Sequence, residues 1–426
     1  MDRRRFLRAL AGVGAGAVSG PALSRLGASP ARPTAASADV RAGAIRTASR
    51  AASFLIPMDE EQPQPLRAYG IVYRALESGG RAEWLLNFRG GAFLVDHPRA
   101  LDEALDRGVW TEDPSASEGA LQAALGTEDT VPMKLEVAPR IAVYVPPYAA
   151  PWDDAVRLAL DFAEIPYRSL WDSEVLRGGL AEIDWLHLHH EDFTGQYGKY
   201  GLGIQTADWY QQAVALDRAT ADEFGFADGR ALKAAVAGEI RDYVASGGFL
   251  FAMCASSETL DVALSSEASN FVGTLAFHDF TIDPSVSGPF STIDGHRVNT
   301  PERLPLDEVS VQRFSATVDP VAAMLTQDHD LRFPDWYGLT TSYRPDTLKP
   351  SVVVLATCNG GALAKYVHGD HGEGSFTFLG GHDPEDPRHA VGDPATDLRE
   401  FPASPGYRLI LNNVLFPAAE KKERLT

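Results

Sequence analysis

The thiol of Cys254 is the side chain in this sequence that best fits the role of a nucleophile. It follows an apolar run in the stretch GGFLFAMCASSETLDVAL and comes directly before a helical pattern. A cysteine attacks as its thiolate, which requires a neighbouring base, and the base requires a group that orients it. His382 supplies an imidazole, and Glu385 or Asp383 supplies a carboxylate that can orient it, in the later segment GGHDPE. The first hypothesis is therefore a Cys-dependent hydrolase that attacks an amide or related acyl carbon, while backbone N–H groups near Ala255 hold the oxyanion.

Further polar side chains follow the expected strands of a parallel sheet. In such a sheet, ligands bind beyond the carboxyl ends of the strands, so residues at those ends meet at one edge. Four separate segments supply polar groups there, and this convergence predicts a substrate cleft. The expected substrate-binding residues are Tyr148, His189, His190, Glu191, Asp192, Gln196, Ser256, Glu258 and Asp383.

The segment HLHHEDFTGQYGKYG is dense in histidines and carboxylates. His187 and His189 share one face of the expected strand, and His190 points to the other face. Because the spacing matches no standard metal motif, the sequence predicts no bound metal and no cofactor, and His187 is expected in the core. A metal-dependent hydrolase centred on His189, His190, Glu191 and His382 is a third hypothesis.

Two patterns of secondary structure divide the chain. Between Leu66 and Val95, β-type residues flank Ser78-Gly79-Gly80, which predicts a hairpin within a small α+β domain at residues 54–137. From 138 to 420, strands alternate with amphipathic helices. This alternation predicts an α/β domain with a doubly wound, mostly parallel, flavodoxin-like sheet and an irregular insertion at about 265–345.

The charge balance limits the partners of this protein. The formal net charge is -20, from 58 acidic and 38 basic residues, and 45% of the residues are apolar. This apolar content is enough for a sizeable core. A nucleic-acid backbone would be repelled by the average field, so the expected partner is a small-molecule or cell-envelope ligand.

The first residues, MDRRRFLR, precede a weakly apolar stretch of alanine and glycine and resemble a twin-arginine export signal. Small residues at Ala36-Ser37-Ala38 suit cleavage. The sequence thus predicts a signal peptide at 1–38, a linker at 39–53 and a periplasmic location. No later segment has the apolar length of a membrane span, so none is expected in the mature chain.

The strand, cysteine and helix at 249–262, followed far downstream by FLGGHDPE, resemble the class I glutamine amidotransferase-like fold. The resemblance implies that Cys254 is the nucleophile, His382 the base and Glu385 the acid of a triad. In that fold the usual elbow is Gly-x-Cys-x-Gly. Here the two glycine positions are Ala252 and Ser256.

The missing glycines favour a second hypothesis, a non-catalytic module. Such a module would keep the fold and use the same cleft to bind a sugar, a peptide or a cell-envelope partner. A disulfide between Cys254 and Cys358 would also remove the nucleophile, and the spacing of the two cysteines leaves that pairing open.

Over nearly the whole mature chain the sequence also resembles a family of exported bacterial proteins that carry the label asparagine synthetase B. The resemblance rests on FLIPMDEEQPQPLRAYGIVY, WLLNFRGGAFLV, PWDDAVRLALDFAEIPY, DWLHLHHEDFTGQYGKY and GGFLFAMCAS, in that order. A true glutamine-dependent asparagine synthetase exposes an amino-terminal cysteine, whereas residue 2 here is Asp2. The Ser-Gly-Gly-x-Asp-Ser loop that holds pyrophosphate is also missing, so the chain is not expected to be a true asparagine synthetase.

Overall fold

The computed structural model describes most of the chain after residue 52. The described residues are 53–125, 131–148, 154–189, 191, 193, 208–265, 352–358, 363–380, 383–386 and 394–419, with five short strands between 272 and 325. The expected signal peptide lies outside these ranges, as does most of the expected insertion. Within the described ranges, no helix has both the length and the apolar character needed to cross a membrane.

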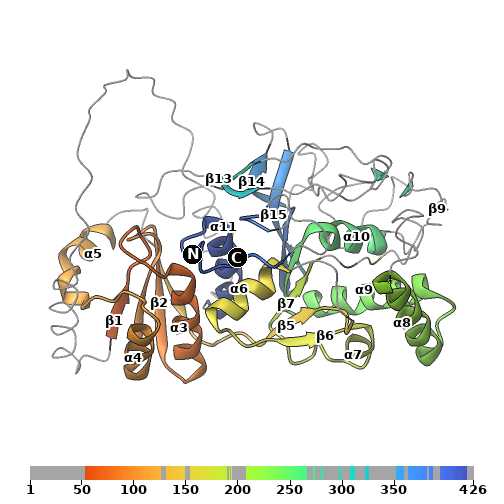
Figure 1. Ribbon diagram of the computed structural model, residues 1–426, viewed down its shortest axis with the longest axis horizontal. Coiled ribbons are helices and arrows are strands. Elements are labelled where there is room, and N and C mark those ends of the chain that lie inside the picture. Colours follow the sequence, from red (N-terminus) through yellow and green to blue (C-terminus); the bar gives the residue numbers. More distant parts are fainter. Residues whose placement is uncertain are drawn as a thin grey trace, which may run out of the picture.

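A four-stranded antiparallel sheet with three α-helices forms the amino-terminal unit (Figure 1). Its strand order is β1-β3-β2-β4. The elements are β1 (Ser53–Ile56), α3 (Pro65–Glu77), β2 (Arg81–Leu86), β3 (Ala92–Asp96), α4 (Pro98–Asp106), η1 (Pro114–Ala116), α5 (Glu118–Leu125) and β4 (Val131–Leu135).

The structure corrects the predicted hairpin around Ser78-Gly79-Gly80, because residues 65–77 form helix α3 instead of a strand. Pro65 begins the helix, and ten of its thirteen residues are buried, including the aromatic and aliphatic residues that suggested a strand. Gly79, at φ +80°, helps to end the helix. The hairpin is formed by β2 and β3, and its turn lies at residues 87–91.

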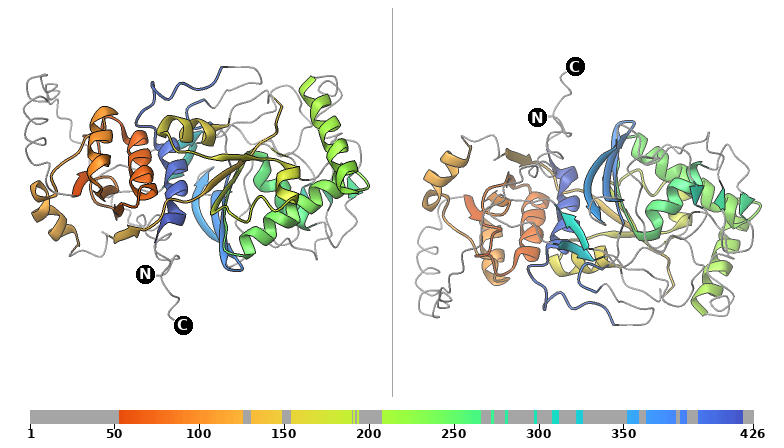
Figure 2. Two further views of the ribbon diagram at one scale, coloured as in Figure 1. Left: turned by 90° about the horizontal axis from the view of Figure 1, so that it is seen from below. Right: turned by 90° about the horizontal axis from the view of Figure 1, so that it is seen from above.

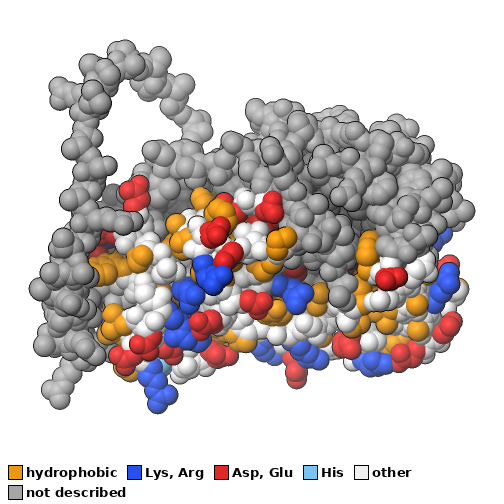
Figure 3. All heavy atoms as spheres, in the orientation of Figure 1, with side chains coloured by type: hydrophobic (Ala, Val, Ile, Leu, Met, Phe, Trp, Pro, Cys, Tyr) orange, Lys and Arg blue, Asp and Glu red, His pale blue; other side chains and the backbone are white. Residues whose placement is uncertain are grey.

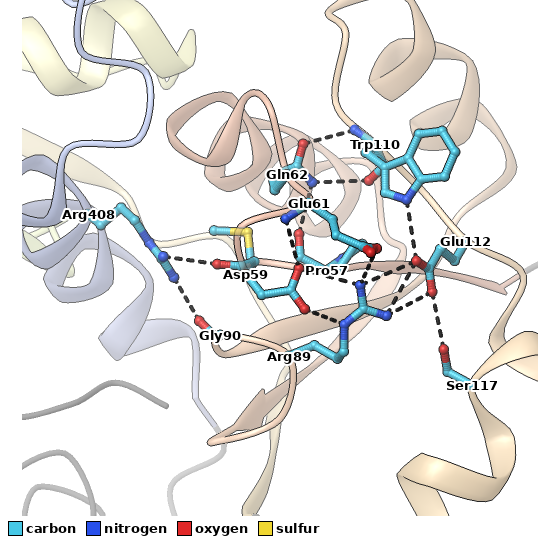
Figure 4. A network of polar contacts seen from close by, with 11 residues as sticks. Pro57, Asp59, Glu61, Gln62, Arg89, Gly90, Trp110, Glu112, Ser117 and Arg408 are labelled. Atoms are coloured by element: carbon cyan, nitrogen blue, oxygen red, sulfur yellow. Dashed lines mark hydrogen bonds and ion pairs between the residues drawn. The ribbon is translucent and has the colours of Figure 1, made fainter. Parts of the chain in front are cut away.

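Arg89 ties this hairpin turn to the surrounding chain (Figure 4). Its guanidinium forms ion pairs with Asp59, Glu61 and Glu112. Arg408, from the carboxyl-terminal helix, donates to the carbonyl oxygen of Gly90 at 2.7 Å. The turn is therefore held both within its own unit and by a helix from the far end of the chain.

The second unit is built on a nine-stranded sheet with the order β13-β12-β14-β15-β16-β8-β7-β5-β6. The five strands from β16 to β6 run parallel, and the remaining pairs are antiparallel. The strands are β5 (Ile141–Tyr144), β6 (Arg168–Leu170), β7 (Trp185–Leu188), β8 (Phe249–Met253), β12 (Glu308–Val311), β13 (Ala322–Leu325), β14 (Val353–Cys358), β15 (Leu363–His371) and β16 (Gly374–Leu379). A small antiparallel sheet contains β9 (Val272–Gly273), β10 (Phe280–Thr281) and β11 (Arg297–Val298).

Helices cover both faces of the parallel strands, which confirms the predicted α/β class with a small α+β unit before it. They are α6 (Ala155–Ala163), α7 (Asp172–Leu176), α8 (Asp208–Phe224), α9 (Gly229–Ala245), α10 (Cys254–Ser265) and α11 (Pro405–Leu415), followed by η6 (Phe416–Ala418). Alternation along each strand sends Trp185 and Phe251 to the face covered by α6 and α11, whereas Leu186 and Leu250 face α9.

The two units share one hydrophobic core. Side chains of α3, α6, α11 and one face of the parallel strands belong to a single buried cluster. Figure 2 shows α11 between the amino-terminal unit and the sheet. Outside this core, acidic and basic side chains are interspersed over the described part of the surface seen in Figure 3. Several of them pair across the junction, as Arg107 does with Glu164 at 2.7 Å.

The contact between α3 and α6 depends on Gly70. A Cβ added there would lie 1.7 Å from the carbonyl oxygen of Ala163, so one helix would have to move. Gly70→Ala is expected to lower the free energy of unfolding by about 1–3 kcal/mol, through overpacking of this junction. Urea denaturation measures the change.

Gly119→Ala is the matched control, because Gly119 is an exposed helical glycine with no atom within 4 Å of the added Cβ. Since alanine favours a helix over glycine, this variant should be as stable as the parent or more stable. If Gly70→Ala and Gly119→Ala were equally stable, the prediction would be wrong, because α3 and α6 would then leave room for a methyl group at position 70.

Candidate functional site

Cys254 lies at a strained junction between a strand and a helix. It follows Met253, the last residue of β8, and is the first residue of α10. Its φ is +49°, in the left-handed region that non-glycine residues rarely adopt. Such strain costs on the order of 1–3 kcal/mol and is concentrated at functional sites. The chain therefore makes a strained elbow between a strand and a helix at the carboxyl end of a parallel strand.

Cys254 does not pair with Cys358, the disulfide that the sequence left open. Cys254 is a buried thiol outside any disulfide. Cys358 ends β14, and two strands, β15 and β16, lie between β14 and β8. Three strand spacings amount to about 14 Å, whereas a disulfide requires Cα atoms within about 7 Å.

Two of the predicted binding residues, Glu191 and Ser256, contact each other beside this elbow. The Ser256 hydroxyl lies 3.0 Å from both the carbonyl oxygen and Oε2 of Glu191. Oε2 also accepts the backbone N–H of His189 at 2.8 Å. Ser256 in turn donates its backbone N–H to the carbonyl oxygen of His189 at 3.0 Å. These bonds fasten the end of β7 to the first turn of α10.

Burial raises the pKa of Glu191, and the charge of Asp154 raises it further, while backbone hydrogen bonds and His189 act in the opposite direction. Its carboxylate is thus held in a place where negative charge is disfavoured. The Ser256 hydroxyl and the His189 amide compensate part of that cost.

A second group of side chains joins Asp154 to His187 and His189 at the end of β7. Oδ1 of Asp154 lies 3.3 Å from Nε2 of His187 and 3.1 Å from Nδ1 of His189. The two imidazoles are fully buried, and the carboxylate is 10% exposed. Burial acts to raise the pKa of Asp154, but the two imidazoles outweigh it and hold this pKa well below its usual range.

Sequence reasoning missed most of this group. It assigned His189 to substrate and His187 to the core, and it did not single out Asp154. The available signal was the alternation His187-x-His189 on a strand together with Asp154 at the start of the helix that follows the neighbouring strand β5. Asp154 caps α6 by accepting the backbone N–H groups of Val156 and Arg157.

The opposite face of the same sheet edge contains a buried lysine with aromatic neighbours. Lys233 lies 2.8 Å from Oδ2 of Asp172 and 3.5 Å from Oδ1 of Asp217. Burial acts to lower the pKa of Lys233, but the two carboxylates outweigh it and raise this pKa. The ammonium also lies 4.2 Å from the ring centre of Trp171. Tyr148, a predicted binding residue, packs edge-on against that ring with 6.5 Å between centroids.

Asp383, predicted to bind substrate, uses its oxygens within the chain. Oδ1 accepts the backbone N–H groups of Glu385 and Asp386, and Oδ2 accepts the hydroxyls of Thr396 and Tyr407. The carboxylate is fully buried. It shapes the turn that follows β16 and thereby fixes the backbone of Glu385.

Several predicted residues lie outside the described part of the chain. They are His190, Asp192, Gln196, His382 and the side chain of Glu258. The pairing of Cys254 with His382 therefore stays a prediction. Within the described residues, the carboxyl edge of the sheet brings together Cys254, Glu191, Ser256 and His189 on neighbouring strand ends.

Three solved structures are similar to this chain at low identity. The cytoplasmic protein STM3548 from Salmonella typhimurium is 13% identical, with a TM-score of 0.30, over 66% of this chain and 100% of that one. The cytoplasmic protein STM1381 from Salmonella typhimurium LT2 is 16% identical, with a TM-score of 0.31, over 69% of this chain and 93% of that one. Gan42B, a GH42 β-galactosidase from G. stearothermophilus, is 10% identical, with a TM-score of 0.26, over 68% of this chain and 32% of that one.

A scan against protein-family models and a search of curated proteins found no match. At the identities and scores above, the likenesses to solved structures assign no activity to this chain.

Lys233 is expected to be essential for stability, because it compensates two buried carboxylates. Lys233→Met should lower the free energy of unfolding by about 3–5 kcal/mol, since Asp172 would be left charged and buried without its partner. Urea denaturation tests this value. Arg399→Met is the control, because it breaks an ion pair with Asp397 at the surface, and it should change stability little. A small loss in both variants would contradict the expectation.

Glu385 should make stability depend on pH. Burial raises its pKa above the ordinary value of 4.5, and Asp383 adds to the effect. A carboxyl with a raised folded-state pKa takes up a proton on folding, so stability falls as pH rises from 4.5 through the folded pKa. Glu385→Gln removes this loss. Its stability relative to the parent should therefore be greater at pH 7 than at pH 4 in urea denaturation, and a difference that does not change with pH would contradict the assignment.

Proposed function

We propose that this chain is a class I glutamine amidotransferase-like hydrolase that uses Cys254 to cleave an amide or a related acyl bond. The observation that carries the proposal is the backbone of Cys254, which has a φ of +49° at the junction of β8 and α10. A buried structural cysteine has no need of this strained conformation, because an ordinary helical φ would bury it equally well. The strain is explained if the thiol must be presented to a substrate.

The chemistry proceeds in two steps. The Cys254 thiolate attacks the acyl carbon, a carbon–sulfur bond forms, and the carbon–nitrogen bond breaks as the amine leaves with a proton from the base. Water then attacks the thioester, gives its proton to the base and releases the acid and the thiol. We assign the base to His382 and its orienting acid to Glu385.

The first turn of α10 favours the charged intermediates. The positive end of a helix dipole stabilises the thiolate of its first residue and the oxyanion that forms beside it. We assign the oxyanion contact to backbone N–H groups at the start of α10, near Ala255. Tyr148 and Glu191 follow the ends of β5 and β7, and Ser256 lies in the first turn of α10. These three residues are proposed to shape the substrate site with His190, Asp192, Gln196 and Glu258.

We also propose that the chain is exported through a twin-arginine signal at residues 1–38 and acts in the periplasm. The arginines at positions 3 to 5, followed by Phe6 and Leu7, support this location. The substrate would then be a small molecule or a component of the cell envelope. The sequence lacks the Ser-Gly-Gly-x-Asp-Ser loop that holds pyrophosphate, so a synthetase reaction is not proposed.

Alkylation with iodoacetamide tests the nucleophile. With His382 as its base, Cys254 should be present partly as thiolate at a pH where an ordinary thiol is protonated. Cys254 should then react severalfold faster than an ordinary thiol at about pH 6.5, as measured by mass spectrometry of the labelled peptide. His382→Ala should remove most of this excess.

Cys358→Ser is the matched control and should leave the labelling of Cys254 unchanged. Cys254→Ser should lose the fast-reacting site. A Cys254 that stays unlabelled in the folded protein, but reacts in urea, would reject the hydrolase and favour the non-catalytic binding module.

A further inference from the structure

We propose that Asp154, His187 and His189 form a binding site for a divalent transition-metal ion, best suited to zinc. Their ligand atoms, Oδ1, Nε2 and Nδ1, all lie within 4.8 Å of one another. The three residues come from separate positions: the cap of α6, the interior of β7 and the residue after β7. We call this set the Asp-His-His cluster. It does not depend on the proposed thiol chemistry.

The distances between ligand atoms fit a single ion. Zinc binds imidazole nitrogen and carboxylate oxygen at about 2.0–2.2 Å, so two neighbouring ligands in a tetrahedral site lie about 3.3 Å apart. The separations from Asp154 Oδ1 to His187 Nε2 and to His189 Nδ1 are 3.3 Å and 3.1 Å. Both separations that involve Asp154 are thus those of neighbouring ligands around one ion, and all three ligand atoms lie within 4.8 Å of one another.

His187 gives independent support for a ligand at this place. Its Nε2 is fully buried and has no hydrogen-bond partner, although the Asp154 carboxylate is near. Its other ring nitrogen, Nδ1, lies 3.0 Å from the carbonyl oxygen of Phe251. A carbonyl oxygen can only accept, so Nδ1 donates to it, and Nε2 is the ring nitrogen that is left to bind a metal ion. A metal-binding histidine is oriented in the same way by a backbone carbonyl.

The charge of the cluster also favours a cation. The carboxylate brings one negative charge into a site where both imidazoles are fully buried and the carboxylate itself is 10% exposed. Two imidazoles and one carboxylate form a donor set that catalytic zinc sites use, with a fourth position open to water or substrate. The backbone N–H groups of Val156 and Arg157 fix the carboxylate from behind.

The location connects the site to the elbow. His187 pairs in register with Phe251 on β8, and the carbonyl oxygen of His189 accepts the backbone N–H of Ser256, two residues beyond Cys254. The bound ion would therefore lie at the carboxyl edge of the same two strands. Among the residues of the metal-dependent hydrolase considered from sequence, only His189 belongs to this cluster.

Zinc binding to the full-length protein tests the proposal. After removal of metal with a chelator, ZnCl2 is titrated by calorimetry, and the unfolding temperature is measured with and without zinc. One equivalent should bind and raise the unfolding temperature. Asp154→Asn should weaken zinc binding by about 10-fold to 100-fold and abolish the rise in unfolding temperature. Asparagine can still cap α6, so the helix should be kept. His189→Ala should have the same effect on zinc.

Two controls separate this site from others. His368→Gln changes a buried histidine of β15 outside the cluster and should still bind one equivalent. Cys254→Ser should also bind one equivalent, because the cluster does not include the thiol. Less than stoichiometric zinc on the parent protein, undiminished binding by Asp154→Asn, or loss of binding by Cys254→Ser would each overturn the proposal.

Discussion

The parallel pairing of β7 with β8 is the constraint on which the candidate site depends. Its register sets His187 opposite Phe251 and Leu188 opposite Ala252, so both strands end at the same level. His189, the residue after β7, then lies level with the elbow at Cys254, and its carbonyl oxygen accepts the backbone N–H of Ser256. Because side chains alternate along a strand, a slip of one residue would exchange the faces of His187 and Leu188. His187 would then no longer contact Asp154, and Leu188 would leave the core on the α9 face.

Buried charged groups lie on both faces of the sheet where β7 pairs with β8. Asp154 approaches the His187 face from α6, while Lys233 and its carboxylates occupy the opposite face beneath α9. Burying an ion costs several kcal/mol unless a partner and hydrogen bonds compensate it. On the α9 face each charged group has a partner, because one ammonium faces two carboxylates and a phenol hydroxyl. On the α6 face His187 Nε2 is left without a hydrogen bond. That contrast is why a ligand is inferred on one face and a structural role on the other.

The parallel part of the sheet could be predicted from the sequence, because the periodic spacing of apolar residues distinguishes its strands from its helices. Apolar strands that alternate with amphipathic helices specify a doubly wound sheet, and the nine-stranded sheet contains that parallel part. The antiparallel half depends on pairings between distant segments, which no local period reveals. Residues 65–77 misled the prediction, because Tyr, Ile and Val suit strands by type and the helix is buried on nearly all sides, so its buried residues show no clear helical period. Only its less buried residues, Arg67, Arg74 and Glu77, recur at helical spacing. Lys233 was not anticipated, since a single lysine in a helix normally reaches solvent.

The position of Cys254 could be predicted, but its conformation could not. In the amidotransferase-like motif that this segment resembles, a glycine stands two residues before and two residues after the cysteine. Here Ala252 and Ser256 occupy these two positions. Neither of these residues has a positive φ, so glycine is not required for backbone freedom at either position. What the elbow requires there is a small side chain, because Ala252 lies fully buried between β7 and β16. Ser256 adds hydrogen bonds to Glu191 and His189 that glycine could supply only in part.

The hydroxyl of Ser257 also donates to the carbonyl oxygen of Cys254 at 2.9 Å. The strain at Cys254 is thus offset by hydrogen bonds from the two serines that follow it, at about 0.5–1.5 kcal/mol each. The strained φ at Cys254 persists because neighbouring residues hold the backbone in place, although neither Ala252 nor Ser256 is a glycine.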